Sequence, residues 1–188
     1  MRITGGEFGG LILKVPKTDA LRPTQDRVRE AIFNIIRSEV EGSDFLDLFA
    51  GSGAVGIEAL SRGARSATFV ERDRRHLVAL KENLAWVKKG ARCGMENVIA
   101  ADVYRYLANY SGAGYTIAFA DPPYALGEEK GYVSVLTTLA ERGIVRAGGL
   151  FIAEMTAVQL ADEANGWELI RDRTYGKTKI CIWRRNNI

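Results

Sequence analysis

The chain has 188 residues, of which 47% are hydrophobic and 26% charged, and its formal net charge is +3 at pH 7. This length and composition suit one sizeable buried core, and so one main domain. The chain has no cationic leader followed by an apolar stretch, no run of about 18 apolar residues, and no CxxC spacing around Cys93 and Cys181. We therefore expect a cytoplasmic protein without a membrane span, disulfide framework or metal site.

The first twenty residues combine glycines with basic side chains. Gly5-Gly6 and Gly9-Gly10 predict tight turns. We therefore expect a small N-terminal β-hairpin arm over residues 1–20, ahead of the main domain over residues 21–188. Arg2 and Lys14 make the segment a candidate mobile arm that contacts a polyanion. A plain hairpin that covers a sheet edge is an equal alternative.

An amphipathic helix is predicted after Thr24. Apolar residues recur at helical spacing through Val28, Ile32 and Ile36. Thr24 is either the N-cap of this helix or a hydroxyl that faces a ligand, and both interpretations stay open. We expect the helix to roof a ligand pocket.

A glycine-rich loop follows the first buried strand. Residues 45–50 lead directly into Gly51-Ser52-Gly53 and then a helix. Glycines let the backbone approach a ligand, and a helix start offers free N–H groups. The next strand ends at Glu71, about 20 residues beyond the first glycine, where an acidic residue normally holds a ribose hydroxyl pair. The pattern predicts a nucleotide-type site.

Acidic residues at strand ends separate two possible cofactors. Asp47 lies at the mouth of the first strand, where it would repel a pyrophosphate but suit the ammonium of a methionine moiety. Asp102 ends the third strand and can accept from an adenine amino group. Each acid alone could be an ordinary surface charge. Four acids at the ends of four successive strands, Asp121 being the fourth, favour S-adenosylmethionine over NAD.

The fourth strand, residues 115–120, leads into Asp121-Pro122-Pro123-Tyr124. Two prolines fix φ at about −65° and remove two backbone donors. Asp121 and the Pro122 carbonyl could accept the protons of an exocyclic amine, and Tyr124 could stack on a base, a contact worth roughly 1–3 kcal/mol. A proline turn that only closes the strand is the alternative.

Basic residues gather near the end of the chain. Arg173, Lys177 and Lys179 lie in a segment whose sequence pattern predicts two strands joined by a turn near Gly176. They could line a phosphate-binding surface. Equally, they could be the cations that discourage edge pairing of exposed strands.

The chain resembles the class I S-adenosylmethionine-dependent methyltransferases, and specifically the RsmD-type 16S ribosomal RNA guanine-N2 methyltransferases. The resemblance covers essentially the whole chain, and its most specific part is the block from Arg22 to Glu30. The other marks are Arg2-Ile3-Thr4-Gly5-Gly6 with Gly9-Gly10, Asp47-Leu48-Phe49-Ala50-Gly51-Ser52-Gly53-Ala54, Glu58-Ala59-Leu60-Ser61-Arg62-Gly63, and Asp121-Pro122-Pro123-Tyr124.

This resemblance implies a fold and a set of site residues. The fold is α/β and Rossmann-like, a mostly parallel seven-stranded sheet with a C-terminal antiparallel strand and the hairpin extension. The cofactor, S-adenosylmethionine, would be lined by Arg22, Thr24, Asp47, Phe49, Gly51, Ser52, Gly53, Glu71, Arg72, Ala101 and Asp102. The guanine would be presented by Asp121, Pro122, Pro123 and Tyr124. RNA would be contacted by Arg2, Lys14, Arg27, Arg173, Lys177 and Lys179.

The expected reaction is direct transfer of the sulfonium methyl group to guanine N2 without a covalent enzyme intermediate. Its substrate would be 16S rRNA, within a small ribosomal subunit or an assembly intermediate, and the enzyme is expected to be a monomer. The alternatives are a DNA or RNA methylase acting on adenine N6 or cytosine N4, and a non-catalytic RNA-binding relative. An NAD-dependent reductase is a further alternative, in which Asp121-Pro122-Pro123-Tyr124 would have no evident role.

Overall fold

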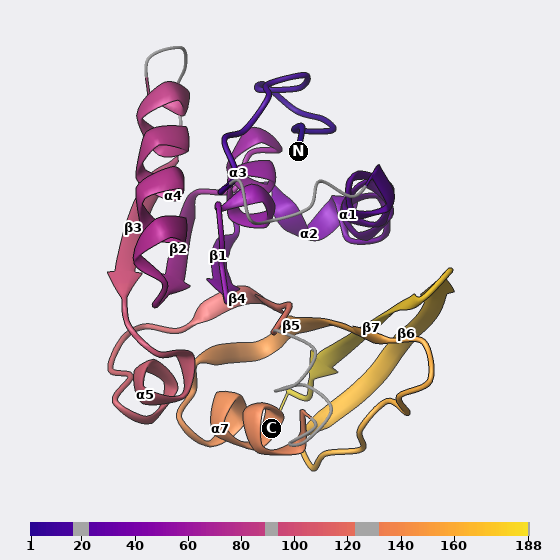
Figure 1. The fold of residues 1–188 in the computed structure, drawn as a ribbon. Helices are drawn as coiled ribbons and strands as arrows, with labels where there is room; N and C mark the ends of the chain where they lie inside the picture. The colour runs from indigo at the N-terminus through magenta and orange to yellow at the C-terminus, as the bar shows by residue number, and fades with distance from the viewer. Residues whose placement is uncertain (17–22, 89–93, 123–131, 188) are drawn as a thin grey trace. The chain divides into compact units, whose positions relative to one another are not determined.

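The computed structural model describes residues 1–16, 23–88, 94–122 and 132–187. The chain forms two compact units, Met1–Asp102 and Val103–Ile188 (Figure 1). The expected boundary at residue 20 lies outside the described residues. No helix in the described part of the chain combines the length and the apolar character needed to cross a lipid bilayer.

The first unit is built from strand–helix–strand repeats. Its strands are β1 (Asp44–Leu48), β2 (Ser66–Glu71) and β3 (Met95–Ala100). β1 pairs with β2, and β2 with β3, both in parallel. The connections are the helices α3 (Ala54–Ser61) and α4 (Arg74–Val87), because parallel neighbours need a crossover. The carboxyl ends of these strands therefore meet at one edge.

The remaining helices of this unit are α1 (Pro23–Ile35) and the short α2 (Arg37–Val40), both ahead of β1. The expected apolar face of α1 is buried at Val28 and Ile32. β1 is buried throughout, as a strand packed on both faces should be.

The N-terminal residues form the expected antiparallel hairpin pairing. Arg2 and Ile12 make an isolated bridge, and the Ile3 N–H donates to the Leu11 carbonyl at 2.9 Å. Ile3 and Leu13 are both buried, so the pairing has an apolar inner face.

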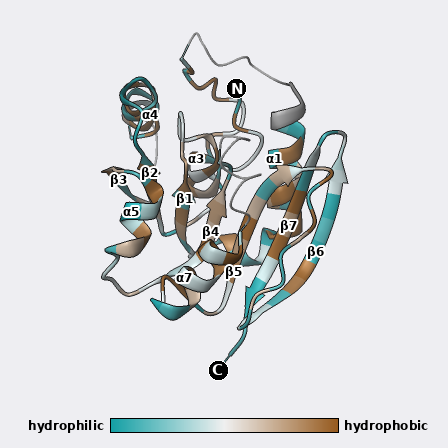
Figure 2. Ribbon diagram, turned by 60° about the horizontal axis from the view of Figure 1, so that its bottom comes forward, coloured by the Kyte–Doolittle hydropathy of each residue, from teal (hydrophilic) through white to brown (hydrophobic). Residues whose placement is uncertain are grey.

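The second unit contains α5 (Val103–Ala108), β4 (Tyr115–Ala120), α7 (Val133–Glu141), β5 (Val145–Thr156), β6 (Trp167–Tyr175) and β7 (Thr178–Arg185). β4 and β5 are parallel, whereas β7 runs antiparallel to both β5 and β6. In Figure 2 the middle of β7 is hydrophobic and much of β6 is hydrophilic. β7 is accordingly buried over six of its eight residues.

An aromatic cluster forms the core of the second unit. The rings of Phe151 and Trp183 stack with centroids 5.6 Å apart, and Tyr132 and Trp167 approach Phe151 at 5.7 and 6.3 Å. Offset and edge-on aromatic pairs of this kind add to the free energy of burial.

The expected fold class is confirmed. The described residues form seven strands, mostly parallel, and β7 is the antiparallel strand near the C-terminus. The helix α5 was not predicted from the sequence, and Trp86 is 60% exposed on α4.

Candidate functional site

The turn after β1 has a strained backbone. Phe49 has a φ of 61°, and Gly51 and Gly53 have φ values of 55° and 86°. A bulky residue in the left-handed region costs roughly 1–3 kcal/mol, and such strain concentrates at functional sites. The glycine-rich sequence thus forms the sharp turn that the ligand-binding hypothesis requires.

Two physical reasons explain why the loop needs glycine at these positions. A Cβ on Gly53 would lie 2.3 Å from Leu80 Cδ1, and one on Gly56 would lie 2.3 Å from Phe69 Cε1. These two glycines let α3 pack closely on β2 and α4. A Cβ on Gly51 would meet no described atom within 4 Å. Gly51 is therefore the position at which a ligand can approach the backbone.

Glu71, at the end of β2, organises this loop. Its Oε2 accepts a hydrogen bond from the Gly51 N–H at 2.8 Å. Its Oε1 accepts from the N–H groups of Arg72 and Asp73, both at 2.7 Å. A carboxylate that accepts from several backbone donors is fixed in orientation, so Glu71 sets the position of Gly51.

Asp47, a buried residue of β1, is hydrogen-bonded to the start of the helix that follows the loop. It is only 1% exposed, and its Oδ2 accepts from the Gly56 N–H at 2.9 Å, in the first turn of α3. Burial raises the pKa of Asp47 from 3.8 to about 7; the Gly56 hydrogen bond opposes this rise, and the charge of Glu71 adds to it. A bound cation would offset the free-energy cost of its charge.

The ends of β2 and β3 bring the remaining cofactor candidates together. Arg72 Nη1 lies 3.1 Å from Asp102 Oδ2, and both side chains are well exposed. The Ala101 N–H donates to the Glu71 carbonyl at 3.0 Å. The first unit thus gathers acidic side chains from three successive strand ends, as the sequence predicted. Arg22 and the side chain of Thr24 lie outside the described residues.

Asn83 is a supporting residue that the sequence analysis missed. Its Nδ2 donates to the Ser52 carbonyl and to the Lys14 carbonyl, both at 2.9 Å, and its Oδ1 accepts from the Lys14 N–H at 2.8 Å. It is 2% exposed. A polar residue beside the apolar stripe of α4 was the available signal, because a buried amide needs partners.

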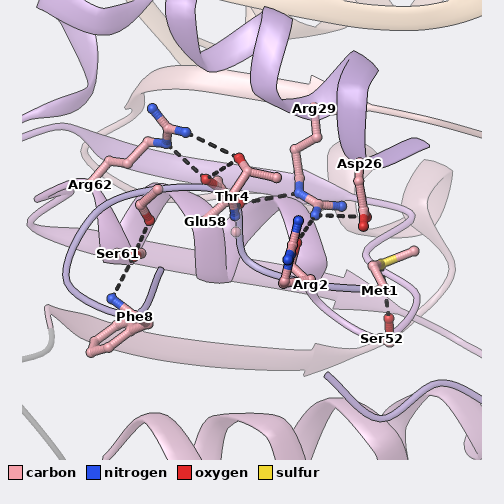
Figure 3. Close-up of polar contacts among 12 residues, drawn as sticks. Met1, Arg2, Thr4, Phe8, Asp26, Arg29, Ser52, Glu58, Ser61 and Arg62 are labelled. Carbon is pink, nitrogen blue, oxygen red and sulfur yellow. Dashed lines mark hydrogen bonds and ion pairs between the residues drawn. The ribbon is translucent and has the colours of Figure 1, made fainter. Parts of the chain in front are cut away.

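A second supporting cluster fastens the N-terminal hairpin to α3 (Figure 3). Glu58, fully buried, accepts from Thr4 N–H at 2.8 Å, Arg62 Nε at 2.8 Å and Arg29 Nε at 3.2 Å. Ser61 Oγ donates to the Gly5 carbonyl at 2.6 Å. The described part of the hairpin is therefore held against α3 by these hydrogen bonds.

In the second unit, Asp121 follows β4 directly and is exposed, whereas Pro122 is buried. Pro123 and Tyr124 lie outside the described residues. Tyr132 donates from its hydroxyl to the Glu154 carbonyl at 2.9 Å. Burial raises the pKa of Tyr132, and the nearby charge of Asp121 contributes to the rise. Burial also raises the pKa of Glu154.

The candidate RNA contacts differ in exposure. The side chains of Arg2, Arg27, Arg173 and Lys177 are exposed. Lys14 is exposed as well and lies 3.0 Å from Glu82. Lys179 is 9% exposed, and its Nζ donates to the Gln159 carbonyl at 2.8 Å. Its ammonium is thus used inside the second unit, so Lys179 is a poor candidate for a phosphate contact.

The sequence and the fold match one family along nearly the entire chain. A family model described as conserved hypothetical protein 95 matches residues 1–184. Ribosomal RNA small subunit methyltransferase D of Escherichia coli (strain K12) is 34% identical, over 98% of this chain and 90% of that protein. The Haemophilus influenzae protein of the same name is 32% identical, over 98% and 93%.

Solved structures agree with the sequence comparison. An Escherichia coli protein that is 34% identical superposes with a TM-score of 0.85, covering 100% of this chain and 99% of that one. A Thermus protein, also 34% identical, has a TM-score of 0.78 over 97% of this chain and 98% of that one. The chain therefore belongs to the conserved hypothetical protein 95 family, the family of the ribosomal RNA small subunit methyltransferase D enzymes.

Proposed function

We propose that this protein transfers a methyl group from S-adenosylmethionine to the exocyclic N2 of a guanine in small-subunit ribosomal RNA. The observation that carries the proposal is the loop of the first unit, where Glu71 holds Gly51 and Asp47 lies buried beneath, in a chain whose full length matches rRNA methyltransferases. The family membership supports the reaction class, and the geometry of the loop supports a cofactor site there.

Three kinds of contact would hold the cofactor. The open backbone at Gly51 suits close approach by the methionine part, and Asp47 supplies the negative potential that favours an ammonium. Glu71 has a carboxylate that can accept from ribose hydroxyls, and Asp102 one that can accept from the adenine amino group. Phe49, Ser52, Gly53, Arg72 and Ala101 complete the proposed set, with Arg22 and Thr24 added from the family resemblance.

The chemical step would need little from the protein beyond positioning. The cofactor would supply an electrophilic methyl group to guanine N2, with the carbon–sulfur bond exchanged for a carbon–nitrogen bond. Asp121 would accept the proton that N2 gives up. Orienting two bound reactants can lower a barrier by roughly 7–11 kcal/mol.

The guanine would be held by Asp121 to Tyr124, after it has left the RNA stack. Arg2, Lys14, Arg27, Arg173 and Lys177 are the proposed phosphate contacts, of which the last two lie on the β6–β7 hairpin. The partner would be 16S rRNA within a small subunit or an assembly intermediate, and the enzyme would act as a monomer.

The direct test uses methyl-labelled S-adenosylmethionine. The protein is incubated in parallel with undermethylated small ribosomal subunits, naked small-subunit rRNA and DNA, and the labelled nucleoside is identified by mass spectrometry. N2-methylguanosine from rRNA is the expected product. Label in adenine N6 or cytosine N4 would move the chain to the alternative substrate class, and the absence of label in all three substrates would refute the proposal.

A further inference from the structure

The chain makes a tight turn directly after β5. This apolar turn, residues 156–160, presents two aliphatic side chains to solvent. Val158 is 88% exposed and Leu160 is 86% exposed, more than any other large hydrophobic residue in the described part of the chain. A single exposed aliphatic residue is ordinary, but two on one short turn indicate a surface that meets a partner.

Gln159, the residue between Val158 and Leu160, fixes the conformation of the apolar turn. Gln159 Oε1 accepts from the N–H of Thr156 at 2.9 Å and from its hydroxyl at 3.1 Å. The Gln159 carbonyl accepts from Lys179 Nζ at 2.8 Å. Because Gln159 is tied on both sides, the turn holds Val158 and Leu160 outward in a defined geometry. Because the turn is already ordered in the free protein, binding a partner costs little further conformational entropy there.

The apolar turn lies at the same edge as Asp121. In the parallel β4–β5 register, Ala120 is opposite Ala153. Asp121 follows Ala120, and Thr156 lies three residues beyond Ala153, about 10 Å along an extended strand. Both the proposed proton acceptor and the apolar turn thus emerge from the carboxyl ends of neighbouring strands.

The β6–β7 hairpin beside the apolar turn has more basic than acidic residues, whereas Asp162 and Glu163 follow the turn along the chain. The Ala157 N–H donates to the Lys177 carbonyl at 3.0 Å, which ties the apolar turn to the β6–β7 hairpin. Lys177 and Arg173 on that hairpin are exposed. Exposed aliphatic side chains beside exposed cations suit nucleic acid, in which apolar bases alternate with phosphates.

We propose that Val158 and Leu160 form a wedge that enters the RNA stack beside the target guanine and keeps open the gap from which that guanine has been extruded. This inference rests on the proposed function. Proteins that unstack bases insert apolar side chains between them, and a base that is extruded for chemistry costs unstacking energy that a filler can recover. Val158 and Leu160 would thus be positioning residues, separate from the Asp121 to Tyr124 segment that touches the base.

The test compares two short RNAs. Both are cut from the region of small-subunit rRNA that the wild-type protein methylates, and both carry 2-aminopurine next to the target guanine, so that unstacking raises its fluorescence. In the first RNA the target guanine is paired, and in the second its pairing partner is replaced to leave it unpaired. The enzymes are the wild type, the double variant Val158→Ser/Leu160→Ser, and Val78→Ser, a control that removes a side chain 59% exposed on α4.

We expect the double variant to lose about tenfold or more in kcat/KM on the paired RNA and less than about threefold on the unpaired RNA, because only the first needs help with extrusion. The fluorescence rise should shrink on the paired RNA. Cofactor affinity and thermal midpoint should match those of the wild type, and Val78→Ser should behave like the wild type throughout.

Equal losses on the two RNAs, or no loss on either, would overturn the wedge while leaving the methyltransferase function intact. Failure of the wild type to methylate guanine both in these RNAs and in undermethylated small ribosomal subunits would overturn the wedge and the proposed function together. A dimeric wild type that the double variant turns into a monomer would assign the apolar turn to contact with a second copy of the chain, and would also overturn the wedge.

Discussion

Glu71 Oε2 accepts a hydrogen bond from the Gly51 N–H at 2.8 Å, across a gap of 20 residues in the sequence. The same carboxylate is the proposed partner of the cofactor ribose. One substitution therefore tests two roles together: the observed role, in which Glu71 fixes the open glycine of the loop, and the proposed role, in which it offers oxygen atoms to the ligand.

Glu71→Gln should weaken cofactor binding by about 10- to 100-fold. The amide replaces one acceptor oxygen with a donor, so an N–H of Gly51, Arg72 or Asp73 loses its partner, at a cost of roughly 1–3 kcal/mol. Calorimetric titration with S-adenosylmethionine measures the change. Glu41→Gln, an exposed glutamate of the same unit, is the control. Unchanged affinity in Glu71→Gln would remove Glu71 from the cofactor site.

Much of the first unit was predictable because its strands and turns follow from short sequence patterns. Apolar runs bounded by glycines located β1 and β2, and the fixed length of a strand–helix–strand unit placed an acid at Glu71. The partner of that acid was not predictable. A hydrogen bond between Glu71 and Gly51 depends on how β1 and β2 align in the sheet, which the spacing of residues along one strand does not report.

Two features of the fold could not be obtained from sequence spacing. Gly148 and Gly149 lie inside β5 at an irregularity, where Tyr115 pairs with Val145 and Ile117 already pairs with Leu150. Glycine signals a turn and a bulge alike. Trp86 is exposed because Leu80, Leu84 and Val87 already fill the buried face of α4.

The buried Asp47 should make the stability of the cofactor-free protein depend on pH. Its pKa in the folded state, about 7, lies above its ordinary value of 3.8, so the folded state binds more protons between these values. The free energy of unfolding should therefore fall as pH rises from about 4 to 7, by at most about 4 kcal/mol. Urea unfolding of the wild type and Asp47→Asn across this range measures the effect, which should be smaller in the variant. Parallel curves would contradict the assignment.

The Glu58 cluster should dominate the stability of the first unit. Glu58→Ala leaves Arg29, 4% exposed, without its buried carboxylate partner, and removes the acceptor of the Thr4 N–H. Breaking a buried ion pair from one side costs roughly 3–5 kcal/mol. Chemical denaturation checks the loss.

A matched pair of variants separates charge from packing in this cluster. Arg29→Met/Glu58→Leu removes the buried Arg29–Glu58 pair while keeping similar volume, although Arg62 loses its Glu58 partner and Asp26 its Arg29 partner. It should therefore recover part of the stability lost in Glu58→Ala. If the double variant is as unstable as Glu58→Ala, the cluster stabilises the hairpin through its geometry and not through charge balance.

Asp121→Ala should abolish methyl transfer and leave cofactor binding largely intact. Asp121 is exposed at the end of β4, and substitutions of exposed residues usually change stability little, so its loss should not unfold the second unit. The proposed cofactor residues all belong to the first unit, and they remain. Single-turnover transfer to rRNA and calorimetric titration with S-adenosylmethionine separate the two effects. Asp121→Asn keeps an acceptor oxygen but cannot take up the N2 proton readily, so it should retain RNA affinity while transfer stays slow. If Asp121→Ala loses cofactor affinity together with its thermal midpoint, Asp121 is a structural residue and the proton acceptor must be sought elsewhere.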